Sequence, residues 1–451
     1  MKIIVAGCGK VGYTLAEQLT AEGHDLTIID ISEEKIQNVT ANLDVMGITG
    51  NGTSFRVQRE AGVEEADLLI AVTNQDELNL LCCLIAKKAG NCKTVARVRN
   101  PEYYAEIGFI KEELGLSLAI NPELAAAADI RHLIQVPSAM EINTFAKGRV
   151  NLVKLVIPEG SEWDNKKVLD IGSLCKISLL ICIVERSHEV MIPDGNTVLK
   201  AGDSISVIAP PEKLNELFAN IGIRTHKIRN VMIAGGSKIA YYLADRLTRL
   251  KMQVKIVETN RKRCEDLCDL LPKARIIHGD ASNHDILLEE GLPQMDAFVS
   301  LTDYDEENIM LSLYAHKVSN AKLITKINKI AYDDVIDDIP VGSIVSPKSL
   351  TTEYIVQYVR SMQNSMGSNV EAVYLMEDNQ VEALEFVIKE RSRVTDIPLM
   401  DLKLKKNLLV CNIVRKGNII VPSGQDSLKT GDIVIIVTTN KGLNDITDIL
   451  A

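Results

Sequence analysis

The sequence predicts an α/β fold, in which a Rossmann-like parallel-sheet core and a small α+β C-module occur twice in tandem. Two observations predict this fold. Short β-branched runs alternate with helical patterns in two long segments, which is typical of parallel sheets with helices on both faces. The second half of the chain also repeats the first at a nearly constant spacing. We expect cores at residues 1–137 and 226–362, and C-modules at residues 138–222 and 366–451.

The elements of the first core follow from its apolar runs. Lys2–Ala6 is a short β-branched strand, and the helix Val11–Glu22 places Val11, Leu15 and Leu19 at helical spacing. Further strands are expected at Asp25–Asp30, Asp67–Val72, Thr94–Arg97 and Ser117–Ile120. The pattern breaks at Pro137. Beyond it, Val150–Ile157 and Ser178–Val184 are expected to be strands of the small C-module, which glycine-containing turns connect.

The repeat is carried by motifs in a fixed order. Lys2–Gly12 recurs 228 positions later as Asn230–Ala240, and Gly50–Thr53 recurs 229 positions later as Gly279–Ser282. Three more pairs of motifs obey the same spacing: Asp76–Asn79 with Asp305–Asn308, Ile192–Gly195 with Val421–Gly424, and Leu199–Asp203 with Leu428–Asp432. So many ordered matches at nearly one spacing indicate a tandem duplication.

Composition excludes several classes of protein. The chain has 451 residues, of which 46% are hydrophobic and 25% charged, and its formal net charge is −11. Because nucleic acids require a basic face, no nucleic-acid partner is expected. No apolar run approaches the ~20 residues that span a bilayer, and the first residues lack the pattern of a signal peptide. The nine cysteines include no C-x-x-C pair, so we expect reduced thiols, no metal site and a cytoplasmic protein.

The first candidate site is a glycine-rich loop between a strand and a helix. It comprises Gly7, Cys8, Gly9, Lys10, Val11 and Gly12, with G-x-G-x-x-G spacing. In this context the first glycine permits a tight turn, the second lets the backbone approach a phosphate, and the third allows close packing of helix on strand. The helix N-terminus then offers amides and a positive dipole end to a pyrophosphate.

Asp30 ends the second strand, eighteen residues after Gly12. A carboxylate there accepts hydrogen bonds from ribose hydroxyls and disfavours a 2′-phosphate, but it does not separate NAD from ATP, ADP or AMP. Other polar groups follow later strands, where open α/β sheets bind their ligands. These candidates are Asn51, Gly52, Thr53, Thr73, Asn74 and Arg97. Glu123 at the start of a helix is a weaker candidate.

The second core departs from the first at the corresponding positions. Its candidate residues are Gly235, Gly236, Ser237, Lys238, Ile239, Glu258 and Lys326. Ser237 replaces Gly9 and so places a Cβ where the backbone approaches phosphates, although Gly236 beside it could compensate. Glu258 replaces Asp30, and Lys326 replaces Arg97. We expect a second pocket that is weaker, differently selective or empty.

The ordered motifs resemble the TrkA family, which comprises the peripheral NAD-binding subunits of Trk potassium uptake systems and is built from RCK (or KTN) domains. The resemblance rests on the glycine loop, Asp30, Gly50–Thr53, Ala71–Thr73 before Asp76, Glu77 and Asn79, Ala96–Val98 and the two Pro-x-Gly…Leu-Lys-x-Gly-Asp modules. It covers the entire chain in the order core, C-module, core, C-module.

The resemblance implies NAD or NADH as cofactor, whereas Asp30 leaves ATP or ADP open as alternatives. It further implies a homo-oligomeric ring of RCK domains, as a dimer or a tetramer. It also implies that this ring lies on the inner face of the plasma membrane, docks on an integral-membrane Trk potassium-translocating subunit and gates it by a change of shape. The stretches Pro122–Leu133 and Pro347–Val359 have apolar stripes that suit packing between cores, or against their own sheet.

Two other functions stay open. Rossmann folds also occur in NAD-dependent oxidoreductases, but a dehydrogenase needs a general acid or base beside the nicotinamide. The C-modules look too small and repetitive to supply one, so we assign no catalytic residue and expect a regulator rather than an enzyme. Cys8 could act as a redox sensor if the helix N-terminus lowered its thiol pKa, or simply pack under the loop. A divalent ion between Asp76 and Glu77 also stays open.

Overall fold

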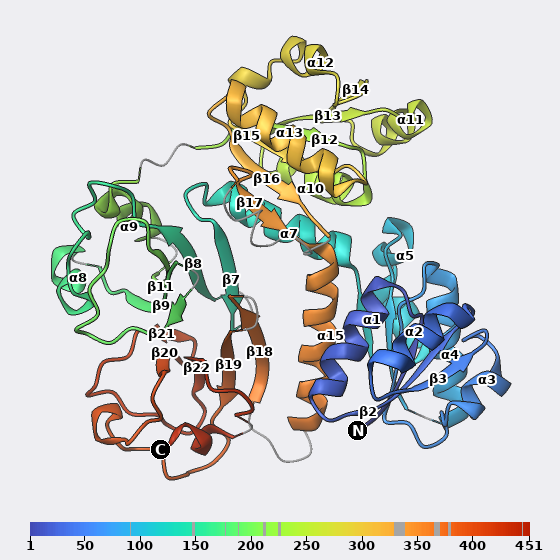
Figure 1. The fold of residues 1–451 in the computed structure, drawn as a ribbon, viewed down its shortest axis with the longest axis horizontal. Coiled ribbons are helices and arrows are strands. Elements are labelled where there is room, and N and C mark those ends of the chain that lie inside the picture. The colour runs from blue at the N-terminus through green and yellow to red at the C-terminus, as the bar shows by residue number, and fades with distance from the viewer. Residues whose placement is uncertain are drawn as a thin grey trace. The chain divides into compact units, whose positions relative to one another are not determined.

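The computed structural model (Figure 1) describes residues 1–90, 92–146, 149–175, 177–187, 189–210, 213–223, 227–328, 339–364, 370–377, 380–443 and 445–451. The chain forms two compact units. The first contains Met1–Arg131 and Arg229–Val356, and the second contains His132–Ile228 and Gln357–Ala451. Each unit therefore combines one part of each repeat. The predicted domain starts at 226 and 366 lie outside the described residues.

The first core is a six-stranded parallel sheet with the order β3-β2-β1-β4-β5-β6. Its strands are β1 (Lys2–Ala6), β2 (Asp25–Asp30), β3 (Met46–Thr49), β4 (Leu68–Ala71), β5 (Lys93–Arg97) and β6 (Leu118–Ile120). Ala6 at the end of β1 lies opposite Ile29 of β2 and Ala71 of β4. The strand order reverses between β1 and β4, which is where open α/β sheets bind ligands.

Helices connect these strands: α1 (Lys10–Ala21), α2 (Glu33–Asn42), α3 (Phe55–Glu60), α4 (Asp76–Gly90), α5 (Pro101–Ala105), α6 (Ile107–Leu114) and α7 (Pro122–Gln135). Helix α1 buries Val11, Leu15 and Leu19, as their spacing predicts. Local capping fixes several of the helix starts. Ser32 accepts a hydrogen bond from the backbone N–H of Lys35 at the start of α2, and Asn100 accepts one from Glu102 at the start of α5.

The second core repeats this topology, with the strand order β14-β13-β12-β15-β16-β17. Its strands are β12 (Asn230–Ala234), β13 (Gln253–Glu258), β14 (Arg275–His278), β15 (Ala297–Ser300), β16 (Lys322–Lys326) and β17 (Ser343–Val345). Its helices include α10 (Lys238–Arg249), α11 (Arg261–Leu270), α12 (His284–Glu289), α13 (Asp305–Val318) and α15 (Pro347–Asn364). The predicted pair of Rossmann-like cores is confirmed.

Each C-module contains a five-stranded antiparallel sheet. The first has the order β10-β9-β11-β8-β7 and the second the order β18-β19-β22-β20-β21. The strands are β7 (Glu141–Phe145), β8 (Val150–Val156), β9 (Leu180–Arg186), β10 (Glu189–Met191), β11 (Ser204–Ile208), β18 (Val370–Met376), β19 (Val381–Val387), β20 (Leu408–Arg415), β21 (Asn418–Ile420) and β22 (Ile433–Thr438). The first module also has helices α8 (Val168–Cys175) and α9 (Leu214–Ile221).

The repeated Gly-Asp motif of the C-modules has a structural role. Asp203 is buried and accepts hydrogen bonds from Arg186 Nε and Nη2, both at 2.7 Å. Asp432 accepts the same pair of bonds from Arg415, at 2.9 and 2.7 Å. Each aspartate also accepts the backbone N–H three residues before it. The motif therefore ties the turn before β11 or β22 to the neighbouring strand.

The two C-modules share an apolar core within the second unit. It includes Phe145, Cys182 and Ile183 from the first module and Met376, Cys411 and Val437 from the second. The rings of Phe145 and Tyr374 meet edge to face, with their centroids 4.5 Å apart. This arrangement buries one face of each sheet against the other.

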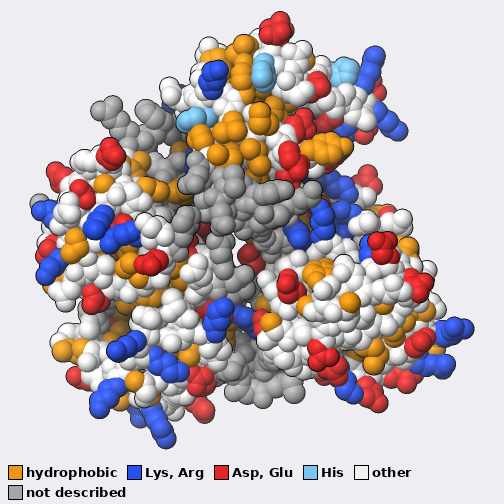
Figure 2. Space-filling model, in the orientation of Figure 1, with side chains coloured by type: hydrophobic (Ala, Val, Ile, Leu, Met, Phe, Trp, Pro, Cys, Tyr) orange, Lys and Arg blue, Asp and Glu red, His pale blue; other side chains and the backbone are white. Residues whose placement is uncertain are grey.

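Hydrophobic side chains gather on one face of the second core in Figure 2. A pocket of about 360 Å³ lies over α12 and α13 and is lined in part by Met310, Leu313 and Tyr314. His284 stacks on Tyr314 with a centroid distance of 3.7 Å. Among the described helices, none combines the length and hydropathy that crossing a membrane requires.

Candidate functional site

The glycine loop of the first core turns sharply between β1 and α1. Gly7 has φ +108°, a left-handed conformation that favours glycine, and its N–H donates to Ile29 O at 2.8 Å. A Cβ on Gly12 would lie 1.9 Å from Gly7 O. The first and third glycines of the motif are therefore required by the loop itself, as the spacing predicts.

Gly9 has a different role from its neighbours. It is the N-cap residue of α1, in an extended conformation, and no side chain caps this helix start. A Cβ on Gly9 would meet no atom within 4 Å. The protein itself therefore does not require glycine here, whereas a phosphate approaching the first turn of α1 at Lys10 and Val11 would.

Asp30 lies at the end of β2 and reaches the glycine loop. Its Oδ2 accepts the N–H of Cys8 at 2.6 Å, and its Oδ1 accepts the N–H of Ser32 at 2.9 Å. Lys35 Nζ lies 3.9 Å from the same carboxylate. The carboxylate is thus held beside the loop, at the position where a ribose would extend from a bound pyrophosphate.

The redox alternative for Cys8 finds no support in its surroundings. Burial raises the pKa of the Cys8 thiol, Asp30 adds to the rise, and Lys35 opposes it. A raised pKa leaves less thiolate, which is the reactive form. The side chain is 5% exposed, as expected for a small residue that packs beneath the loop.

The loop between β3 and α3 approaches the same edge of the sheet. Asn51 Oδ1 accepts hydrogen bonds from the N–H and Oγ1 of Thr53, at 2.9 and 2.8 Å. A Cβ on Gly52 would lie 3.2 Å from Ala6 Cβ and from Cys82 Sγ. Gly52 therefore lets this loop pack against the end of β1, next to the glycine loop.

A buried asparagine joins the ends of β4 and β5. Asn79 Oδ1 accepts the N–H and Oγ1 of Thr73 at 2.8 and 2.7 Å, and its Nδ2 donates to Arg97 O at 2.9 Å. Asn79 belongs to a repeated motif and to the family resemblance, but the sequence assigned it no role. The available signal was its recurrence as Asn308, which holds Thr302 and Lys326 in the same way.

The predicted cation Arg97 lies at the carboxyl edge of the sheet. It is 9% exposed, and its Nη2 donates to Thr73 O at 2.6 Å. Its Nε is buried without a hydrogen-bond partner. Burial and the neighbouring Arg99 lower the pKa of Arg97 to about 10, so it stays cationic at neutral pH. The unused donor makes Arg97 suitable for binding an anion.

Sequence reasoning missed Arg99, which completes this charged edge. Arg99 Nη2 donates to Asn74 O at 2.5 Å, and the guanidinium lies 3.7 Å from Asp76 and 4.0 Å from Glu123. Burial raises the pKa of Glu123, and Arg99 and Arg97 oppose the rise. Two arginines and two acids therefore surround the residues that follow β4, β5 and β6.

Asp76 and Glu77 do not share one binding site. Asp76 Oδ2 accepts the N–H groups of Arg99 and Asn100, both at 2.7 Å, whereas Glu77 Oε1 accepts Tyr103 OH at 2.8 Å. Within the described parts of the chain, no group of three or more His, Cys, Asp or Glu side chains is arranged to hold a metal ion.

The second core fills its own loop with side chains. Gly235 keeps the left-handed turn at φ +97°, but Ser237 caps α10, and its Oγ accepts the N–H of Ala240 at 3.4 Å. Arg263 Nε donates to Gly236 O at 2.7 Å. Lys238 and Ile239 form the first turn of α10. The helix start that is uncapped in the first core is therefore capped here.

The acid of the second core is held by backbone N–H groups as Asp30 is in the first, and its cation, Lys326, is buried. Glu258 Oε2 accepts Gly236 N–H and its Oε1 accepts Asn260 N–H, both at 2.6 Å. Burial lowers the pKa of Lys326, and Asp303 and Asp305 oppose this effect. The two cores thus share a backbone but present different groups to a ligand.

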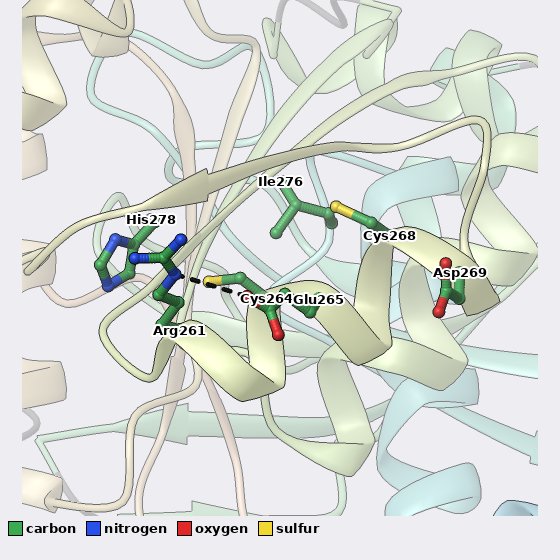
Figure 3. Close-up of a pocket in the computed structure, with 7 residues that line it drawn as sticks. All are labelled: Arg261, Cys264, Glu265, Cys268, Asp269, Ile276 and His278. Atoms are coloured by element: carbon green, nitrogen blue, oxygen red, sulfur yellow. Dashed lines mark hydrogen bonds and ion pairs between the residues drawn. The ribbon is translucent and has the colours of Figure 1, made fainter.

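Another pocket of the second core, of about 520 Å³, is shown in Figure 3. It is formed by α11 and the edge strand β14. Arg261 and His278 lie at one end and Asp269 at the other, with Cys268 beside Ile276. None of the predicted binding residues lines it.

Comparison with known proteins identifies the domains. The TrkA-N domain family matches residues 3–122 and 231–347, and the TrkA-C domain family matches residues 152–222 and 383–451. The Trk system potassium uptake protein TrkA homolog of Archaeoglobus fulgidus is 33% identical over 437 residues, which cover 97% of each chain. Trk system potassium uptake protein TrkA of Halomonas elongata is 31% identical over 450 residues, which cover 98% of this chain and 96% of that protein.

Solved structures share the fold at lower identity. The GsuK channel bound to NAD matches with a TM-score of 0.63 and 16% identity, over 98% of this chain and 77% of that one. The GsuK RCK domain matches with a TM-score of 0.64 and 16% identity, over 98% and 92% of the two chains. The resemblance drawn from the repeated motifs is confirmed: the chain belongs to the TrkA family.

Proposed function

We propose that this chain is the cytoplasmic regulatory subunit of a Trk-type potassium transporter or channel. A nucleotide bound in the first core changes its conformation, and that change gates potassium transport through an integral-membrane Trk subunit. One observation carries the nucleotide site: the uncapped start of α1 lies beside a glycine loop to which the Asp30 carboxylate is hydrogen bonded. Membership in the TrkA family supports the link to potassium uptake.

The bound ligand in this proposal is NAD or NADH, with ATP or ADP as alternatives. The amides at Gly9, Lys10 and Val11 receive the phosphates, and Asp30 accepts the ribose hydroxyls. Arg97, with its unused Nε, balances the phosphate charge. The loop Asn51–Thr53 and the residues Thr73 and Asn74 line the two sides of the ligand. We assign no residue a catalytic role.

The second core has a different role in this proposal. Ser237 already occupies the helix start that a pyrophosphate would use, and Arg263 donates to the loop carbonyl of Gly236. A dinucleotide would have to displace the serine hydroxyl and accommodate its Cβ. The nucleotide site of the second core therefore binds nucleotides more weakly than that of the first core, or stays empty.

A thermal-unfolding titration tests the nucleotide site. Wild type and Gly9→Val are heated with NAD, NADH, ATP, ADP or NADPH; a ligand at about 100 times its Kd adds roughly 2.7 kcal/mol of stability. Because a Cβ at Gly9 meets no protein atom within 4 Å, we expect the variant to fold and to lose the ligand-induced shift. Equal shifts in both proteins, or none in wild type, would contradict the proposal.

The partner is tested separately. We propose a homo-oligomeric ring, as a dimer or a tetramer of the chain, that docks on the cytoplasmic side of the membrane subunit. Light scattering of the purified chain gives the oligomeric state. Potassium uptake by cells that hold the membrane subunit is then measured with wild type and with Gly9→Val. Nucleotide-dependent gating predicts altered uptake in the variant. Identical uptake would show that the nucleotide site does not control transport by the membrane subunit.

A further inference from the structure

One side chain of the second core reaches the nucleotide edge of the first core. Tyr242 in α10 accepts a hydrogen bond from Asn121 Nδ2 at 2.9 Å, and its hydroxyl donates to Arg99 O at 3.4 Å. Both partners belong to the first core, where they follow β6 and β5. The two cores lie in the same compact unit.

The two partners of Tyr242 hold the charged edge of the proposed site. Arg99 donates through its side chain to Asn74 O, and its backbone follows Arg97 by two residues. Asn121 caps α7, where its Oδ1 accepts Leu124 N–H at 2.9 Å, and that helix carries Glu123 in its first turn. A shift of Arg99 or of the start of α7 therefore changes the hydrogen bonds of Tyr242.

This edge is arranged to respond to an anion. The Nε of Arg97 and the Oε2 of Glu123 are buried without hydrogen-bond partners, and the Nε of Arg99 makes no hydrogen bond but lies 3.7 Å from Asp76 Oδ1. Because buried, unsatisfied polar groups are costly, a bound phosphate that uses the arginine donors stabilises a new arrangement of these side chains. Among these residues, Arg99 is also bonded to Tyr242, through its backbone carbonyl.

The tyrosine is suited to carry such a link. Burial raises the pKa of Tyr242 to about 12, and the Asn121 hydrogen bond opposes the rise. The hydroxyl therefore keeps its proton and can accept and donate at the same time. Lys238, one turn earlier on α10, also lies near enough to oppose the raised pKa of Glu123.

The equivalent residue of the first core makes a local contact instead. The residue of the first core that corresponds to Tyr242 is Thr14, 228 positions earlier. Thr14 Oγ1 donates to Lys10 O within its own helix, at 3.0 Å. The first core thus holds the candidate ligand site, and the second core supplies the side chain that contacts its edge.

We infer that Tyr242 is a positioning residue that couples occupancy of the first nucleotide site to the second core. The inference rests on the proposed nucleotide site. Ligand binding at Arg97 and Arg99 alters the hydrogen bonds of Tyr242 and, through them, the stability of α10. A ligand that contacts only the first core then changes the conformation of both cores.

The test is hydrogen exchange of the full chain with and without saturating NADH, in wild type and Tyr242→Phe. Tyr241→Phe is the matched control, because it removes a hydroxyl from the neighbouring residue of the same helix. In wild type and in the control, NADH is expected to slow exchange in the loop 7–12 and in α10. In Tyr242→Phe the loop keeps its protection, α10 loses it, and NADH affinity falls about fivefold, as for one lost hydrogen bond.

The outcomes separate the two proposals. Protection of the loop but not of α10 in wild type would overturn the coupling and leave the nucleotide site standing. Protection of α10 that persists in Tyr242→Phe would also overturn it. Protection of neither region in wild type, with NADH and with ADP, would overturn the nucleotide site and with it the inference.

Discussion

Lys154 of the first C-module forms an ion pair with Glu377 of the second. The residues at the equivalent positions of the two repeats also contact each other, but with different chemistry. Ala146 and Glu377 are equivalent: each follows the strand end before a hairpin, and their φ angles are 50° and 48°. By the same register Lys154 corresponds to Glu385. Glu385 Oε2 accepts Ala146 N–H at 2.9 Å. The two modules therefore pack about an approximate two-fold axis, which relates these two contacts. One contact is an ion pair, and in the other a carboxylate accepts a hydrogen bond from a backbone amide.

The burial of the Glu377 carboxyl predicts a dependence of stability on pH. Burial raises the pKa of Glu377 to about 7, against the opposing effect of Lys154, and Glu141 and Glu185 add to the rise. Between its ordinary value of 4.5 and about 7, the folded chain holds this proton and the unfolded chain does not. The folded state therefore binds more protons, and the stability of the second unit falls as pH rises through this window.

Glu377→Gln removes this titration. We expect thermal unfolding of wild type to lose stability from about pH 5 to 7 relative to the variant, and the difference to level off above pH 7. Glu371→Gln, at an exposed position of the same β18 strand, is the control and should track wild type. Parallel pH profiles for wild type and Glu377→Gln would show that Glu377 titrates normally.

Two glycines of the first loop predict opposite outcomes. Gly12→Ala places a Cβ 1.9 Å from Gly7 O, so the loop must shift, at a cost of about 1–3 kcal/mol or more. Gly9→Ala meets no atom within 4 Å and should change stability by less than about 0.5 kcal/mol. Denaturant unfolding measures the first effect. Nucleotide titration measures the second, since Gly9→Ala should weaken binding although the fold is intact.

The two strand-end acids predict different effects on binding. Asp30→Ala removes the charged acceptor for the ribose and should weaken NADH or ADP binding by about 10- to 100-fold, the range for hydrogen bonds to charged groups. Glu258→Ala should leave that affinity unchanged, because the second loop is capped by Ser237. Calorimetric titration of both variants with NADH and with ADP measures these affinities. A larger loss for Glu258→Ala would place the main site in the second core.

Much of the fold could be predicted from the sequence, because the evidence was local or repeated. The strands Lys2–Ala6 and Asp25–Asp30 are found at the predicted residues, since apolar β-branched runs between polar ends leave little choice. The glycine spacing predicted the turn at Gly7 and the close contact at Gly12 for the physical reasons that the structure shows.

Other features depend on contacts between distant segments. The link from Tyr242 to Asn121 spans 121 positions, and the ion pair of Lys154 with Glu377 spans 223. Neither has a local pattern, because a tyrosine on a helix or a lysine on a strand is usually a surface residue. The regrouping of the four domains into two mixed units has the same origin. The sequence showed that Asn79 is repeated, but it did not predict that the side chain is buried.

Asn79 provides the last prediction, because it holds the site without contacting the proposed ligand. Asn79→Ala leaves Thr73 N–H and Arg97 O without the bonds that Asn79 provides, at roughly 1–3 kcal/mol for each group. Asn308→Ala is the matched control, since it removes the same bonds to Thr302 and Lys326 in the second core. Both variants should lose similar stability in denaturant, but only Asn79→Ala should weaken nucleotide binding, because Thr73 and Arg97 are no longer held in register. Equal nucleotide affinity in the two variants would show that the positions of these residues do not matter for binding.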